Sequence, residues 1–126
     1  MSQVVTDTGG NYDIIIDDGG HVYSQQKATF EVLWSHLSPG GLYYIEDLQV
    51  SSSKDGMIRE MLGWADQIAN CRSEACVNMA HYVKYPITWI TWPSSVPPDM
   101  ISVHCQAEIC VMKKSYAKPT TVQPRA

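Results

Sequence analysis

The sequence predicts an α/β fold in which parallel strands are followed by a closing antiparallel hairpin. Two apolar runs, residues 14–16 and 42–45, are separated by a stretch with helical periodicity. A strand–helix–strand crossover normally makes its two strands parallel, so this stretch predicts a parallel pair. Two further strand-like runs, 100–104 and 109–113, flank a short turn and predict the hairpin.

The first strand is the run of isoleucines at 14–16, which leads into Asp17, Asp18, a glycine pair and His21. An unbroken apolar run bounded by turn residues predicts a strand that is buried on both faces. Residues 1–11 are polar and contain glycine, which indicates a loose lead-in to a domain spanning 12–114.

The connecting helix is predicted from apolar residues at the spacing of one helix face. These residues are Phe30, Leu33, Trp34 and Leu37. The Pro-Gly-Gly triplet at 39–41 is predicted to end the helix. The second strand, 42–45, then runs into Glu46 and Asp47, so both strands end in a pair of carboxylates.

These four carboxylates lie at the carboxyl edge of the predicted sheet, where open α/β folds bind ligands. Alternation sends Asp17 and Asp18 to opposite faces, so we do not expect all four to converge. Clustered carboxylates repel unless a proton or a cation neutralises them, which favours a hard ion such as magnesium, manganese or calcium. His21 is placed to act as a base near neutral pH. The alternative is that the acids cap a helix and the histidine is structural.

The rest of the chain predicts a second helix over 57–70, with one apolar face: Met57, Met61, Leu62, Ala65 and Ile68. The preceding loop, 51–56, suits either substrate contact or a plain helix entry. A short helix is predicted over 75–83, and Trp89 and Trp92 are interpreted as covering the core. The tail from 115 to 126 is predicted to be disordered.

Composition excludes several classes of protein. A chain of 126 residues forms at most one domain, and a net charge of −4 leaves no basic footprint for nucleic acid. No apolar run approaches the roughly 20 residues of a membrane helix. No secretory signal is visible, so a cytoplasmic location and reduced thiols are expected.

The remaining cysteines and histidines carry no site motif. Two cysteine pairs, Cys71 with Cys76 and Cys105 with Cys110, lack the usual zinc spacing. Whether the second pair faces across the hairpin stays open. Three histidines without a motif are interpreted as structural or surface residues: His36, His81 and His104.

Residues 15–21, 30–34 and 39–48 resemble the class I S-adenosylmethionine-dependent methyltransferases. The closest resemblance is to the metal-dependent sugar O-methyltransferases of macrolide biosynthesis and the cephalosporin-hydroxylase-like group. Those families carry a D-D-G-S/G-H turn and a P-G-G-x-Y-x-I-E-D strand at this spacing. The resemblance implies a Rossmann-like sheet, with Asp18, Glu46 and Asp47 as ligands of Mg²⁺ (or Mn²⁺). It also implies His21 as the catalytic base and Asp17 as an acid on the cofactor-binding side.

The resemblance further implies methyl transfer from S-adenosylmethionine to the hydroxyl of a small molecule. The glycine-rich turn of the cofactor-binding half does not occur before residue 14, so we expect the carboxyl-terminal half of such a domain, incomplete as an enzyme. Two alternatives stay open. One is a non-catalytic half-domain that binds partners, with its first strand exposed for self-association. The other is a carboxylate-metal hydrolase on a similar sheet.

Overall fold

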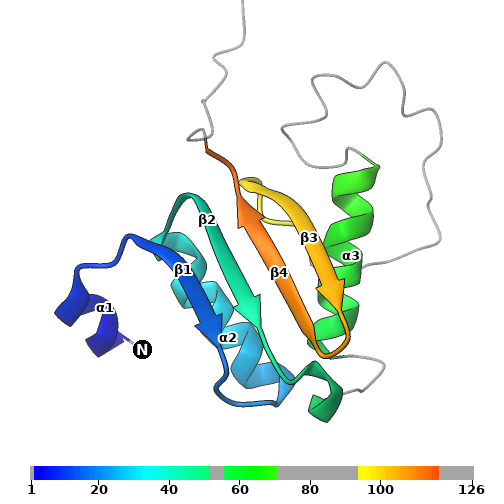
Figure 1. Cartoon of the computed structure of the whole chain (residues 1–126), viewed down its shortest axis with the longest axis horizontal. Coiled ribbons are helices and arrows are strands. Elements are labelled where there is room, and N and C mark those ends of the chain that lie inside the picture. Colours follow the sequence, from blue (N-terminus) through cyan, green and yellow to red (C-terminus); the bar gives the residue numbers. More distant parts are fainter. Residues whose placement is uncertain (1, 52–55, 71–93, 117–126) are drawn as a thin grey trace, which may run out of the picture.

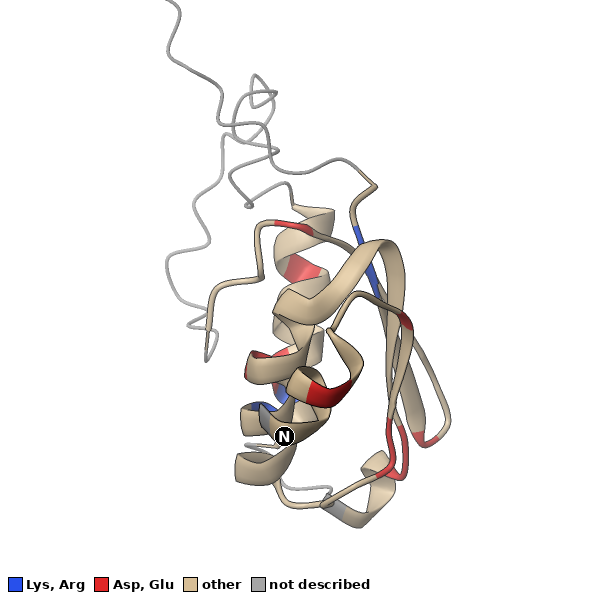
Figure 2. Ribbon diagram, turned by 90° about the vertical axis from the view of Figure 1, so that its left-hand side faces the viewer, with Lys and Arg blue, Asp and Glu red and all other residues tan. Residues whose placement is uncertain are grey.

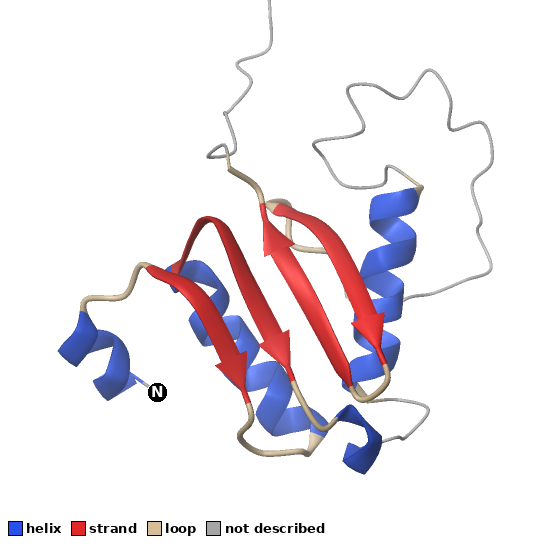
Figure 3. Cartoon of the chain, in the orientation of Figure 1, coloured by secondary structure: helices blue, strands red, loops and turns tan. Residues whose placement is uncertain are grey.

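The structure, a computed structural model, describes residues 2–51, 56–70 and 94–116. The elements are α1 (Ser2–Thr8), β1 (Tyr12–Asp17), α2 (Tyr23–Leu33), the 3₁₀ turns η1 (Trp34–His36) and η2 (Leu48–Ser51), β2 (Leu37–Ile45), α3 (Met57–Ala69), β3 (Met100–Gln106) and β4 (Ile109–Lys114). The strands form one four-stranded sheet in the order β1-β2-β4-β3 (Figures 1 and 3). The predicted α/β fold is confirmed.

The pairing of the strands follows the prediction. β1 and β2 are parallel, with Ile14 opposite Leu42 and Asp17 opposite Ile45. β2 pairs antiparallel with β4, and β4 pairs antiparallel with β3 as a hairpin. The parallel pair therefore ends at one edge of the sheet, beside the turn of the hairpin (Figure 1).

Helices α2 and α3 lie on the same side of the sheet, and no described element lies on the other side (Figure 2). Ile15 and Asp17 face the helices and are buried, whereas Ile14 and Ile16 are 58% and 59% exposed. The prediction that β1 is buried on both faces was therefore wrong for the described chain. A run of isoleucines does not show whether other elements pack on one face of the strand or on both.

The core fills the space between the helices and the covered face of the sheet. Its centre is aromatic: the Phe30 ring lies 5.2 Å from Trp34, 5.2 Å from Tyr43 and 4.9 Å from Trp64, measured between centroids. The buried apolar residues are Ile15, Phe30, Trp34, Leu37, Tyr43, Ile45, Leu48, Met57, Met61, Trp64, Val96, Met100, Cys110 and Met112. Tyr43 and Ile45 belong to this core, so the second strand is anchored just before its two carboxylates.

The predicted end of the first helix was wrong. α2 ends at Leu33, η1 follows, and β2 already begins at Leu37, so the triplet at 39–41 lies inside the strand. The register between β1 and β2 shifts between Tyr12 and Ile14, and Gly40 has φ +77°. Glycine adopts this conformation without steric cost, so the extra residues bulge out of the strand.

Two further predictions need correction. The lead-in at 1–11, expected to be loose, contains the helix α1. In α3, predicted correctly as a helix, Met57 and Met61 are fully buried, but Leu62 is 52% exposed and Trp64 takes the core position instead.

Cys105 and Cys110 form a disulfide across the β3–β4 hairpin. The expectation of reduced thiols was wrong for this pair. The two residues lie directly opposite each other in the register, with their Cα atoms 4.1 Å apart, because the hairpin turn between Gln106 and Ile109 is only two residues long.

Several predictions fall on residues outside the described part of the chain. These are the loop at 52–55, the helix at 75–83, Trp89 and Trp92, Cys71 and Cys76, His81, and the tail from 117. Among the helices that the structure describes, none is both long enough and apolar enough to cross a membrane.

Candidate metal site

The site lies where β1 and β2 end at the same edge of the sheet. Asp17 pairs with Ile45 in the parallel register, and the Glu46 N–H donates to the Asp17 carbonyl at 3.1 Å. The residues that follow each strand, Asp18 and Asp47, therefore leave the sheet side by side. Acidic segments gather at this edge in Figure 2.

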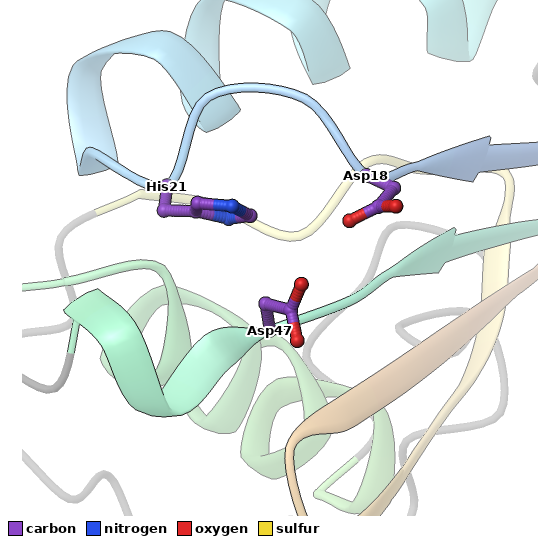
Figure 4. A group of neighbouring side chains, drawn as sticks. All are labelled: Asp18, His21 and Asp47. Carbon is purple, nitrogen blue, oxygen red and sulfur yellow. The ribbon is translucent and has the colours of Figure 1, made fainter.

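Asp18, His21 and Asp47 point toward one another (Figure 4). One potential ligand atom from each residue lies within 4.8 Å of the corresponding atoms of the other two. Asp18 is exposed, while His21 and Asp47 are half-buried. The structure thus brings together three of the five residues predicted for the site.

The arrangement fits a small divalent cation. Two ligands of one Mg²⁺ ion lie at most about 4.2 Å apart, so a small rotation of these side chains brings their atoms into range. The carboxylates suit Mg²⁺ or Mn²⁺, whereas imidazole is more often a ligand of zinc, copper or iron. Asp18 and Asp47 as metal ligands and His21 as a base stay predictions.

Asp47 is held in place by an unusual backbone. Its φ of +54° is uncommon for a residue with a side chain, although aspartate tolerates it better than most. The next residue, Leu48, is buried and donates its N–H to the Glu108 carbonyl of the hairpin turn at 3.0 Å. Asp47 consequently stands at a sharp bend between the sheet and η2, with its carboxylate at the edge.

Glu46 is half-buried and does not belong to the group that the structure brings together. Its role as a third ligand stays a prediction.

Asp17 is separated from the group as well. Its carboxylate is 8% exposed and lies on the side of the sheet that the helices cover. Burial raises the pKa of Asp17 above its ordinary value of 3.8, while the hydrogen bonds from the Gly19 N–H and the Tyr43 hydroxyl act in the opposite direction. Its role on the cofactor-binding side also stays a prediction.

Tyr43 contacts Asp17, one of the predicted site residues, and the sequence reasoning did not identify it. Its hydroxyl donates to Asp17 Oδ2 at 3.4 Å, and burial, followed by the Asp17 charge, raises the pKa of Tyr43 far above its ordinary value. The signal was available: Tyr43 and Ile45 alternate with Tyr44 along the strand, which places Tyr43 on the covered face.

A hollow of about 240 Å³ lies on the open face of the sheet, away from this group. It is lined by Tyr44, His104, Gln106, Ile109, Cys110 and Val111. None of the residues predicted for the site lines it, so it does not locate a substrate.

Comparison with known proteins links this chain to antibiotic sugar methyltransferases. No known protein-family profile matches it. It is 33% identical over 88 residues to 8-demethyl-8-alpha-L-rhamnosyl tetracenomycin-C 2'-O-methyltransferase of Streptomyces olivaceus, covering 65% of this chain and 21% of that protein. It is 51% identical over 39 residues to demethylmacrocin O-methyltransferase of Streptomyces fradiae, covering 31% of this chain and 10% of that protein.

A similar solved structure is the MycE methyltransferase from the mycinamycin biosynthetic pathway, in complex with Mg and SAH. The TM-score is 0.63 and the sequence identity 20%, over 98% of this chain and 32% of that chain. This likeness confirms the fold. The chain spans only about a fifth of the first relative and a third of the solved structure. The resemblance inferred from the sequence is thus confirmed: the chain is similar to a segment of the macrolide and tetracenomycin sugar O-methyltransferases.

Proposed function

We propose that this chain is part of an S-adenosylmethionine-dependent O-methyltransferase that methylates a hydroxyl of a small molecule with the help of Mg²⁺ or Mn²⁺. The observation that carries the proposal is the Asp18, His21 and Asp47 group at the carboxyl edge of the sheet. Relatives named as sugar O-methyltransferases support the reaction class, and the Mg and SAH in the MycE complex support the cofactors.

In this proposal Asp18 and Asp47 hold the cation, and Glu46 is a third ligand. When bound, the cation lowers the pKa of the acceptor hydroxyl and S-adenosylmethionine supplies an electrophilic methyl group. The imidazole of His21 takes the hydroxyl proton on its unprotonated ring nitrogen. Holding the base beside the cation-binding carboxylates at one sheet edge supplies proximity.

Cofactor binding is proposed to need a segment beyond these residues. α2 and α3 both cover one face of the sheet (Figure 3). Right-handed crossovers that run in one direction along a sheet place their helices on one face, so helices for the open face must come from strands on the other side of β1. Ligands of open α/β sheets bind where this direction reverses. The longer relatives have room for such a segment.

A second candidate function is favoured by β1, which is an edge strand of the described sheet. Ile14 and Ile16 are exposed on β1, which has a strand neighbour on only one side among the described residues. An exposed apolar edge strand is a template for pairing with another chain. The chain would then act as a non-catalytic half-domain, or as a homo-oligomer joined through β1.

A cytoplasmic location stays a prediction.

The metal site is tested by titrating Mn²⁺ into the wild-type chain and into Asp18→Asn and Asp47→Asn by calorimetry. We expect the wild type to bind one ion and each variant to bind more than about tenfold more weakly, because each loses a charged ligand. Asp13→Asn removes the same charge from an exposed position on β1 and is the matched control. Equal binding in all four proteins would refute the site.

The need for a further segment is tested by gel filtration and by titration with S-adenosylmethionine. We expect self-association through β1 and weak cofactor binding for residues 1–126 alone. A monomer that binds the cofactor with micromolar affinity would contradict this part of the proposal and leave the metal site untouched.

A further inference from the structure

Asp17 is a buried carboxylate next to the metal site, and each of its side-chain oxygens has its own partner. The Gly19 N–H donates to Oδ1 at 3.2 Å. The Tyr43 hydroxyl donates to Oδ2 at 3.4 Å. The residue is 8% exposed, so its side chain has little contact with solvent.

The bond to Gly19 shapes the turn that carries the site. An aspartate that accepts the N–H two residues further along closes an Asx turn, which fixes the direction of the chain after a strand. Here the turn begins with Asp18 and leads to His21, so two of the three members of the site depend on it. A Cβ atom on Gly19 would lie 3.2 Å from Asp17 Oδ1, which shows how closely the turn is wrapped around this carboxylate.

The backbone of Asp17 contacts the end of β2, which carries the other part of the site. The Asp17 carbonyl accepts the Glu46 N–H at 3.1 Å, directly before Asp47. Asp17 therefore contacts the turn through its side chain and the end of β2 through its main chain. Asp17 thus links the turn after β1 to the segment after β2.

Tyr43 provides the fixed point for this arrangement. Its side chain is completely buried, and its ring packs edge-on against Phe30 with 5.2 Å between centroids. The hydroxyl is therefore held by the aromatic core. A hydrogen bond from such a group limits the rotation of the Asp17 carboxylate and keeps Oδ1 aimed at Gly19.

We propose that Asp17 is a positioning residue that, anchored by Tyr43, holds the turn so that Asp18 and His21 face Asp47. This inference rests on the proposed metal site, and it assigns Asp17 a role different from contact with the cofactor. Residues that orient metal ligands typically contribute 10–100-fold to metal affinity. The structure thus assigns the two adjacent aspartates different tasks: Asp18 binds and Asp17 aligns.

The test compares Asp17→Ala, Asp17→Asn and Tyr43→Phe by Mn²⁺ titration without S-adenosylmethionine. We expect Asp17→Ala to bind Mn²⁺ about 10–100-fold more weakly than the wild type. Asp17→Asn keeps an oxygen that accepts the Gly19 N–H, so most of the affinity is retained. Tyr43→Phe loses only the anchoring hydroxyl and has an intermediate affinity. Asp13→Ala, an exposed change on the same strand, has no effect.

The Gly19 amide proton gives a readout that is independent of metal. A hydrogen bond to a carboxylate shifts this NMR signal downfield, so it should move upfield in Asp17→Ala and move little in Asp17→Asn. Far-UV circular dichroism establishes that each variant is folded.

Unchanged Mn²⁺ affinity in a folded Asp17→Ala variant would overturn the inference, and so would weaker S-adenosylmethionine binding with unchanged Mn²⁺ affinity, which would indicate direct cofactor contact. If Asp17→Ala does not fold, wild-type affinity in Tyr43→Phe overturns it instead. A wild-type chain that binds no Mn²⁺ refutes the proposed function, and the Gly19 signal then decides separately whether Asp17 holds the turn.

Discussion

Carboxylates lie beside other polar groups in two regions of this molecule. Neighbouring side chains balance the negative charge in one region and leave it unbalanced in the other. In the buried cluster between α2, α3 and the segment before β3, Glu60 is 1% exposed. It accepts hydrogen bonds from Lys27 Nζ at 2.6 Å, from the Ser94 hydroxyl, and from the Tyr23 hydroxyl at 3.4 Å. Trp64 Nε1 donates to the same serine oxygen at 3.1 Å. The charge of Glu60 is compensated inside the protein.

The edge group of Asp18, His21 and Asp47 lacks such compensation. Within the described residues, no lysine or arginine forms an ion pair with either carboxylate, and the Gln49 amide donates to Asp47 at 3.4 Å. Carboxylates whose charge is balanced by neighbours hold the fold together, while those left unbalanced at a ligand-binding edge are available for a cation. This contrast distinguishes a structural cluster from the proposed metal site, and four predictions test it.

The largest effect is expected in the buried cluster. Glu60→Ala leaves Lys27 largely buried beside a missing partner, which should lower the free energy of unfolding by about 3 kcal/mol. Urea denaturation measures the loss. Glu31→Ala removes the exposed partner of the same lysine, 3.7 Å away, and should cost at most about 0.5 kcal/mol. Similar losses for both variants would mean that burial does not distinguish the two carboxylates.

The edge group should respond to metal instead. Mn²⁺ at a hundred times its dissociation constant should raise the free energy of unfolding of the wild type by about 2.7 kcal/mol. Asp47→Asn should reduce this increase to about 1.4 kcal/mol or less without destabilising the metal-free protein, because binding that is about tenfold or more weaker lowers the gain and removing one of two neighbouring negative charges relieves repulsion. Thermal denaturation with and without Mn²⁺ measures both effects. A marked loss of stability in metal-free Asp47→Asn would show that the edge group is structural.

The disulfide should contribute next. Cys105 and Cys110 close a short loop, so reduction by a dithiol is expected to lower the free energy of unfolding by about 2 kcal/mol. The Glu108 carbonyl in this hairpin turn accepts the Leu48 N–H beside Asp47, so Mn²⁺ affinity should also fall. The Cys105→Ala/Cys110→Ala double variant is the control and should not respond to the reductant. Unchanged Mn²⁺ affinity after complete reduction would show that the hairpin does not support the edge group.

The smallest effect concerns Asp17, which is buried like Glu60 but paired with a tyrosine and an amide. Because burial raises its pKa above the ordinary value of 3.8, the unfolded chain releases this proton first as the pH rises. Its contribution to stability is therefore complete below pH 3.8 and is lost as the pH rises through the pKa of the folded state. Asp17→Asn should lack this loss. Denaturation between pH 3.5 and 7 measures the difference, and a wild-type advantage that grows with pH would contradict it.

Much of the framework could be predicted because it depends on local pattern. Apolar runs, helical spacing and a short turn between two strand-like runs predicted β1, β2, α3 and the hairpin. The crossover rule then placed both pairs of strand-end carboxylates at one edge. This reasoning placed the four acids at one edge with His21 within reach, and the family resemblance then assigned roles to individual residues.

Tertiary structure decided what depends on neighbours distant in sequence. The helices cover only one face of the sheet, so Ile14 and Ile16 are exposed. Residues 39–41, which were predicted to end a helix, lie inside β2, where the chain bulges at Gly40. Packing buried Asp17 and brought the Tyr43 hydroxyl within hydrogen-bond distance of its carboxylate. The sequence by itself determined which residues are candidates for the chemistry, because residue type and spacing are local. Which carboxylate is exposed and which is buried was decided by packing, because burial depends on elements that the local pattern does not contain.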